Sequence, residues 1–130
     1  MAANLLGSCL ALVLALAWPA QAAPESVAET EIQYLLAFVA DSNCDFIRNG
    51  TSHESAEAAD HLRLKYSRGR KYAGTAEQFI DRLASESSWT GKPYTVNCGG
   101  RTEPVRDWLR RALADYRSTP AAKPGDQVRQ

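Results

Sequence analysis

The chain has 130 residues, of which 45% are hydrophobic and 23% charged, and its formal net charge is zero. A chain of this length is expected to form one small domain with a modest core. The charge is unevenly placed: eight acidic residues and one basic residue, Arg48, lie between Glu25 and Asp60, whereas fourteen basic and seven acidic residues follow from His61 onward. The two halves either attract each other in the fold or present a basic face to an anionic partner.

The first twenty-two residues resemble an export signal. An apolar run from Leu5 to Ala17 is followed by Trp18-Pro19 and by the small-x-small pattern Ala20-Gln21-Ala22 that signal peptidase reads. The run is too short for a permanent membrane anchor. We therefore expect a secretory signal peptide over residues 1–22, cleavage after Ala22, and a periplasmic or secreted protein with no transmembrane anchor in its mature chain.

Two cysteines remain after cleavage, because Cys9 leaves with the signal. An even number of cysteines in an exported protein predicts a disulfide, here between Cys44 and Cys98. It would close a loop of about 55 residues, which the chain-entropy model values at roughly 4 kcal/mol. The alternatives are a catalytic thiol or half of a metal site, although with only His53 and His61 to help, the spacing matches no zinc site.

The first part of the mature chain reads as a helix followed by a hairpin. Ser26 and Glu29 form a capping-box pattern, in which Ser26 caps the helix and Glu29 reaches back. An apolar stripe at helical spacing follows, made of Ile32, Leu35, Leu36 and Val39. Asn49-Gly50, between Phe46–Arg48 and a short return strand at Thr51–His53, is typical of a two-residue hairpin turn.

The remainder predicts three more helices and a strand. A second helix is expected from Glu54 to Tyr66, and a third follows the capping-box pattern of Thr75 and Gln78. Tyr94–Cys98 reads as a strand that Gly99-Gly100 break, and Pro104 opens a fourth helix. We expect an α+β fold, with about four helices packed on a two- or three-stranded antiparallel sheet, a single disulfide, one compact domain over residues 23–117 and a disordered tail over residues 118–130.

Four segments resemble one known family. In chain order they are Cys44–Gly50, Ala58–Tyr66, Thr75–Ile80 and Ser87–Tyr94. They resemble the YfeK-like family of small exported bacterial proteins of unknown function, over about Ile32 to Leu113, with Thr90 where many relatives are expected to carry Ser. The resemblance implies a bacterial, periplasmic protein and implies no activity.

His61 is the candidate for chemistry, because Glu57 and Lys65 share its helix face. As a general base it would need a nucleophile, such as Ser87 or Ser88, which would make the protein a small hydrolase. No nucleophile-elbow or Ser-x-x-Lys motif supports this. The alternative is a surface histidine bonded to a backbone carbonyl or to Glu57.

Two segments are candidates for a binding surface. The first is the basic stretch, which comprises Arg63, Lys65, Arg68, Arg70 and Lys71. It could bind an anionic glycan or lipid surface, or it could be a solvated helix end; export argues against nucleic acid as a ligand. The second is the loop that carries Trp89, Thr90, Lys92 and Tyr94. Thr90–Tyr94 resembles the protruding loop of periplasmic lysozyme inhibitors, and the alternative is a turn shaped by Gly91.

From the sequence alone we expect a non-enzymatic envelope protein, a small binding module for an envelope protein or an anionic glycan or lipid. A lysozyme-inhibitor-like protein and a small hydrolase are the alternatives. No cofactor or metal is expected, because no phosphate-binding glycine loop or metal-ligand cluster is present in the sequence.

Overall fold

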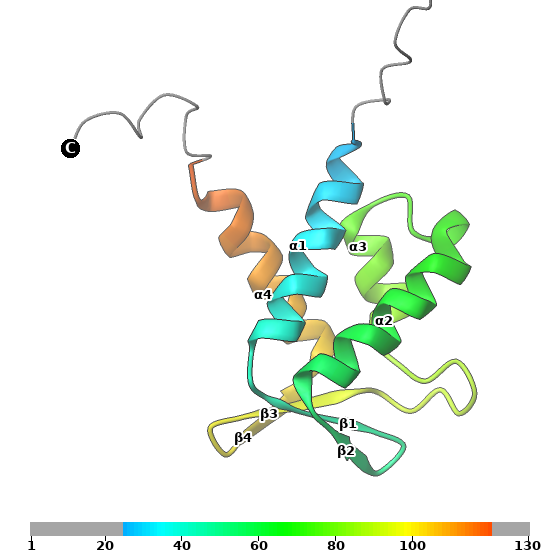
Figure 1. The fold of residues 1–130 in the computed structure, drawn as a ribbon, viewed down its shortest axis with the longest axis vertical. Helices are drawn as coiled ribbons and strands as arrows, with labels where there is room; N and C mark the ends of the chain where they lie inside the picture. The colour runs from blue at the N-terminus through cyan, green and yellow to red at the C-terminus, as the bar shows by residue number, and fades with distance from the viewer. Residues whose placement is uncertain (1–24, 121–130) are drawn as a thin grey trace, which may run out of the picture.

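The computed structural model describes residues 25–120, which form an α+β fold with all helices on one side of a small sheet (Figure 1). The elements in chain order are α1 (Val27–Asp41), β1 (Asp45–Arg48), β2 (Thr51–His53), α2 (Ser55–Gly69), η1 (Arg70–Tyr72), α3 (Ala76–Phe79), η2 (Ile80–Ala84), β3 (Thr95–Cys98), β4 (Arg101–Pro104) and α4 (Val105–Ser118). The predicted signal peptide and the predicted tail beyond residue 120 lie outside the described residues.

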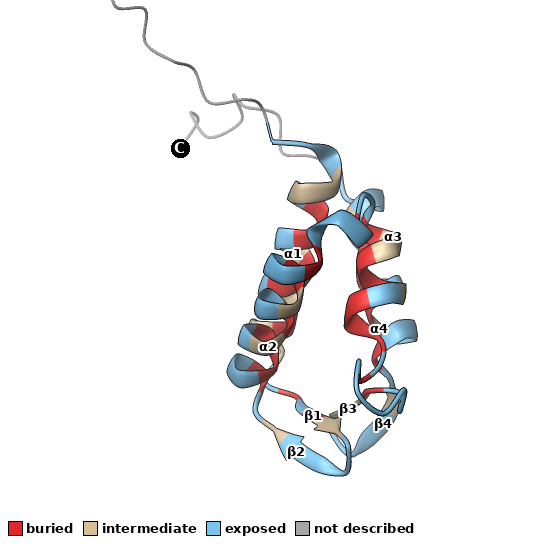
Figure 2. Ribbon diagram, turned by 90° about the vertical axis from the view of Figure 1, so that its right-hand side faces the viewer, coloured by how far each residue is buried: buried red, intermediate tan, exposed pale blue. Residues whose placement is uncertain are grey.

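The core lies between two pairs of helices. Figure 2 shows α1 and α2 on one side and α3 and α4 on the other, with their buried faces turned toward each other and the sheet closing one end. The predicted apolar stripe of α1 is fully buried, as are Phe79 and Ile80 from the third helical segment and Leu109 from α4. None of the helices within residues 25–120 is long and apolar enough to cross a membrane.

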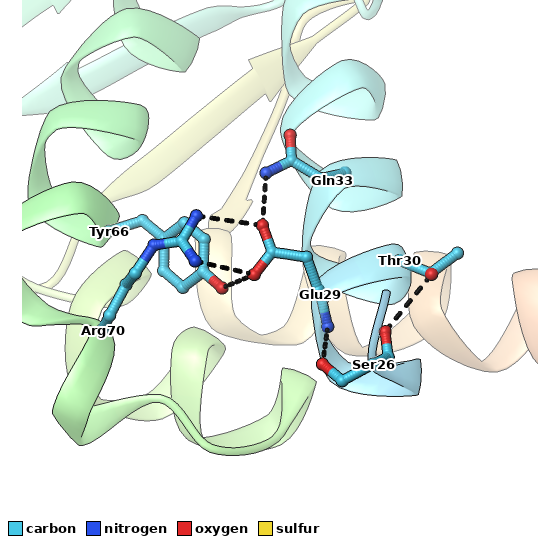
Figure 3. Close-up of polar contacts among 6 residues, drawn as sticks. All are labelled: Ser26, Glu29, Thr30, Gln33, Tyr66 and Arg70. Atoms are coloured by element: carbon cyan, nitrogen blue, oxygen red, sulfur yellow. Dashed lines mark hydrogen bonds and ion pairs between the residues drawn. The ribbon is translucent and has the colours of Figure 1, made fainter. Parts of the chain in front are cut away.

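The N-terminal cap of α1 forms as predicted only in part. The Ser26 hydroxyl accepts a hydrogen bond from the Glu29 backbone N–H at 3.1 Å. The Glu29 carboxylate does not return to Ser26: it accepts from the Tyr66 hydroxyl at 2.6 Å and from the Arg70 guanidinium at 3.0 and 3.1 Å (Figure 3). The reciprocal half of the capping box was therefore wrong, because a tertiary partner on α2 takes the carboxylate.

The sheet has four antiparallel strands in the order β2-β1-β3-β4, one or two more than predicted. The hairpin between β1 and β2 is confirmed, with Asn49 at φ 50° and Gly50 at φ 80°. The missed strand is β4, which pairs with β3 through a turn at Gly99 and Gly100. Both glycines have positive φ, so they reverse the chain into a second hairpin rather than merely ending a strand.

The second and third helices also differ from prediction in detail. The predicted end at Tyr66 was too early, since α2 runs on to Gly69. Gly69 packs against Leu83, and a Cβ added at Gly69 would lie 2.8 Å from a Leu83 methyl carbon. Thr75 caps α3 as expected, and the chain then widens into the π-helical segment η2. This close packing holds the end of α2 against η2.

The predicted disulfide is present between Cys44 and Cys98, whose Cα atoms are 4.8 Å apart and 54 positions apart in sequence. It joins the start of β1 to the end of β3. The observed pairing of Phe46 with Val96, and of Asp45 with Asn97, places the two cysteines directly opposite each other if the same register is continued by one residue. The bond therefore locks the register of the two central strands.

Removing this bond should lower stability without changing the fold. We expect the double variant Cys44→Ser/Cys98→Ser to lose about 2–4 kcal/mol in the free energy of unfolding, because the unfolded chain regains its loop entropy. Urea denaturation of the oxidised protein, the reduced protein and the variant measures this. Coincident unfolding curves for all three would contradict it.

Glu29 should make the fold sensitive to acid. The Tyr66 hydrogen bond, opposed by desolvation and assisted by Gln33 and Arg70, lowers the pKa of the Glu29 carboxyl from 4.5. A depressed folded pKa gives stability that is present above 4.5 and is lost as pH falls through the folded value. The change in urea midpoint between pH 6 and pH 3 should therefore be smaller in Glu29→Gln than in the wild type. An equal change in both proteins would show that this carboxylate does not contribute.

Candidate functional site

A partly open pocket of about 300 Å³ lies between α2 and the helix-facing side of β1, and we call it the α2–β1 pocket. Its floor is apolar and comes from four elements that also build the core: Phe46, Leu62, Ala84 and Val105. Polar side chains gather on its walls: Arg48, His53, Glu57, Asp60, His61 and Tyr94. This volume is at the lower end of the range typical of small-molecule sites.

The strand register explains why Arg48 faces the pocket. Side chains alternate across a strand, so Cys44, Phe46 and Arg48 point to the same side of the sheet. The β1–β3 register, continued by one residue, sets Arg48 opposite Tyr94 as it sets Cys44 opposite Cys98. A cation therefore stands on the helix-facing side, where α2 brings His61 against it.

Three of these wall residues, Arg48, His61 and Tyr94, form a connected cluster with Lys65 of α2, which we call the Arg48 cluster. Arg48 Nη1 lies 2.8 Å from His61 Nδ1 and 2.9 Å from Nε2. His61 Nε2 lies 3.3 Å from the Tyr94 hydroxyl, to which Lys65 Nζ donates at 3.2 Å. Lys65 also donates to the Glu86 carbonyl at 2.9 Å. The imidazole thus lies between two cationic side chains.

Burial and charge set the proton states of the Arg48 cluster. Burial, together with the positive charges of Arg48, Lys65 and His53, lowers the pKa of His61 from 6.5, so its imidazole is neutral at neutral pH. Burial also lowers the pKa of Lys65, opposed by Glu86 and assisted by Arg48, and burial raises the pKa of Tyr94. The neutral imidazole offers a lone pair to Arg48, which can only donate.

The two cations of the Arg48 cluster are not in close ion pairs, although the charge of Glu86 acts on Lys65. Within residues 25–120 neither Arg48 nor Lys65 forms an ion pair with a carboxylate. The two acidic residues on the pocket wall have other partners: Glu57 lies 2.8 Å from His53, and Asp60 accepts from Arg63 at 3.0 Å. Both cations are half-buried, where an uncompensated charge is costly. The wall is therefore suited to an anion.

The hydrolase arrangement that the sequence left as an alternative does not assemble among the described residues. Glu57 pairs with His53 rather than with His61. The Ser87 hydroxyl accepts from the Asn49 side chain at 3.2 Å and from the backbone N–H groups of Trp89 and Thr90 at 3.3 and 3.4 Å. No hydrogen bond joins His61 to Ser87 or Ser88 within residues 25–120. Ser87 is instead buried and supports the loop.

The loop before β3 is braced and carries an exposed tryptophan. Thr90 Oγ1 donates to Asn49 Oδ1 at 2.6 Å, and the Gly91 N–H donates to the Ser87 carbonyl at 2.9 Å with Gly91 at φ 69°. Trp89 is 98% exposed, and Lys92 is also exposed. Of the loop residues singled out from the sequence, only Tyr94 is buried and joins the Arg48 cluster.

The basic stretch does not form one face. Lys65 turns toward Tyr94, whereas Arg70 turns the other way and pairs with Glu29 on α1. Arg63 pairs with Asp60 on its own helix, and Lys71 lies over the Tyr72 ring at 5.0 Å. Arg68 is exposed. Lys65 is therefore the one member of the stretch that takes part in the Arg48 cluster.

Sequence analysis missed the role of Arg48. The sequence did not single it out as a site residue, whereas the structure sets it against His61. A signal was available: once Cys44 is paired with Cys98, antiparallel pairing and strand alternation place Arg48 opposite Tyr94 on the same side as Phe46.

Arg48 should hold down the pKa of His61. In Arg48→Gln, loss of the nearby positive charge should raise the His61 pKa relative to the wild type, with burial keeping it below 6.5. The pH dependence of the imidazole proton shifts in NMR spectra measures this. Arg68→Gln is the matched control, because Arg68 is exposed on the same helix as His61 and is not among the charges that act on its pKa. An unchanged pKa in Arg48→Gln would contradict the assignment.

Comparison with known proteins confirms the family resemblance. A model described as a family of unknown function (DUF5329) matches residues 26–117. A relative from Salmonella typhimurium, described as an uncharacterized protein YfeK, is 45% identical over 87 residues, which cover 66% of this chain and 72% of the relative. No solved structure was found to match. Since the family model spans most of the chain, the protein belongs to the DUF5329 family, whose function is unknown.

Proposed function

We propose that this protein is an exported, non-enzymatic binding protein of the bacterial envelope, and that it holds a small molecule in the α2–β1 pocket. The observation that carries the proposal is the pocket itself, in which polar groups converge over an apolar floor. Such a combination supplies burial energy for an apolar body and a fixed orientation for a polar end.

Two features support export. The predicted signal peptide over residues 1–22 would direct the protein to export. The Cys44–Cys98 disulfide is of a kind that persists in oxidising compartments. The mature protein would begin at Ala23 and work in the periplasm or outside the cell.

The neighbouring side chains favour binding over catalysis. His61 is neutral and is held between Arg48 and Tyr94, so its ring nitrogens are directed at these partners. The Ser87 hydroxyl, one of the two proposed nucleophiles, accepts hydrogen bonds that brace the loop. A general base needs a nucleophile within hydrogen-bond reach, and within residues 25–120 neither Ser87 nor Ser88 is hydrogen-bonded to His61.

A second candidate function is contact with an envelope macromolecule through the loop before β3. Trp89 favours this, since a fully exposed tryptophan on a braced loop is typical of a binding anchor. The exposed Lys92 could contact the acidic cleft of a lysozyme, as in an inhibitor, or bind an anionic glycan. The hydroxyl of Thr90 is already engaged by Asn49, which weakens the likeness to an inhibitor loop.

Filling the pocket should weaken the binding of an apolar probe. We expect the neutral dye N-phenylnaphthylamine to bind the wild type with one-to-one stoichiometry, measured by its fluorescence, and Ala58→Phe to weaken binding at least tenfold, a loss of about 1.4 kcal/mol. Ala58 lines the pocket from α2. Ala56→Phe is the matched control, because Ala56 is exposed on the same helix.

Equal binding by both variants would show that the pocket is not the site. The loop that carries Trp89 would then become the candidate surface.

A further inference from the structure

We propose that the α2–β1 pocket binds a single-chain amphiphile with an anionic head, a carboxylate or a phosphate monoester, whose charge lies beside Arg48 and Tyr94 and whose alkyl chain covers the apolar floor. This inference rests on the proposed function, because it names the ligand class of the same pocket.

We infer that the ligand's head group is negatively charged because Arg48 forms no ion pair with a carboxylate of the described residues. Arg48 and Lys65 are half-buried, and their contacts within the Arg48 cluster go to a neutral imidazole and a neutral hydroxyl. The described acidic groups on the pocket wall, Glu57 and Asp60, have partners of their own. An anionic head would supply the ion pair that Arg48 lacks, whereas a cationic head would place a second positive charge beside Arg48.

We infer that the rest of the ligand is apolar because the floor of the α2–β1 pocket is apolar. Phe46, Leu62 and Val105 belong to the buried core, yet they also line the pocket. Leu64, which is 45% exposed, extends this apolar lining toward the opening. A pocket of about 300 Å³ has room for one short alkyl chain and not for the two long chains of a phospholipid.

The Tyr94 hydroxyl gives the head a second contact. It accepts from Lys65, and its distance of 3.3 Å from His61 Nε2 lets it accept from the imidazole N–H when the lone pair of Nδ1 takes the Arg48 bond. In this arrangement the phenolic proton is free to donate to an anion in the pocket. Arg48 can donate from its remaining N–H groups to the same anion.

Binding of an anion should couple to protonation of His61. A negative charge nearby favours the imidazolium, so an anionic ligand should raise the His61 pKa and bind more tightly as pH falls from 8 to about 5.5. The charged and titratable groups around the imidazole are Arg48 from β1, His53 from β2, Lys65 from α2 and Tyr94 at the entry to β3. Glu57 and Asp60 from α2 line the same pocket, and the charge of Glu86 acts on Lys65 and Tyr94.

The test compares four ligands with one alkyl chain and different heads: octanoate, octyl phosphate, octanol and octylammonium. Isothermal titration of the mature, disulfide-bonded protein should show octanoate or octyl phosphate binding at least tenfold more tightly than octanol, and octylammonium more weakly still. Whichever of the two anions binds more tightly shows whether the preferred head group is a carboxylate or a phosphate monoester. Shortening the preferred anion by two methylene groups should weaken it roughly tenfold, if both groups are buried.

Variants assign the charge to Arg48. Arg48→Gln should weaken the anionic ligand at least tenfold and octanol by much less, whereas Arg68→Gln, which removes an exposed charge from α2 outside the pocket lining, should bind both as the wild type does. Because the comparison of heads uses the wild type alone, it holds even if Arg48→Gln fails to fold.

Two results would overturn this inference. If octanol binds as tightly as both anions, the proposed preference for an anionic head is wrong. The dye experiment with Ala58→Phe tests separately whether the pocket is the binding site. Anion affinity unchanged in a folded Arg48→Gln would remove the assigned contact. Absence of binding by every ligand and by the dye would instead contradict the proposed function itself.

Discussion

The antiparallel pairing of β1 with β3 is the constraint on which the rest of the structure depends. The Cys44–Cys98 disulfide fixes its register at one end. Two residues on, Phe46 pairs with Val96 in the core, and two residues beyond that Arg48 stands opposite Tyr94. One covalent bond thus keeps both the centre of the sheet and the pocket wall in place, in a domain too small to bury much surface.

The Arg48 cluster does not look like a device for stability. Half-buried cations beside a neutral imidazole lose hydration, and a hydrogen bond to a neutral acceptor returns less than an ion pair would. Elsewhere the fold pairs such groups, as it does where Arg117 bonds the buried carboxylate of Glu31 and where Arg70 meets Glu29. An unpaired arrangement at the wall of an apolar pocket is therefore better explained by a ligand that completes the charge.

Much of the fold could be predicted from local patterns. The helical spacing of apolar residues predicted the stripe of α1, and Asn49-Gly50 predicted the first hairpin. The even number of cysteines after signal cleavage predicted the disulfide. The strand β4 was missed because Arg-Thr-Glu-Pro has no apolar alternation and depends on the glycine turn before it. The partners of Glu29, Lys65 and Arg48 could not be predicted, because long polar side chains choose among neighbours that only tertiary packing brings near.

A crystal structure of the disulfide-bonded protein with octanoate tests the central claim most directly. The account predicts the carboxylate within hydrogen-bonding distance of the Arg48 guanidinium and the Tyr94 hydroxyl, with the alkyl chain against Phe46 and Val105. A carboxylate that points to solvent, or a chain bound on another surface while the pocket stays empty, would contradict it.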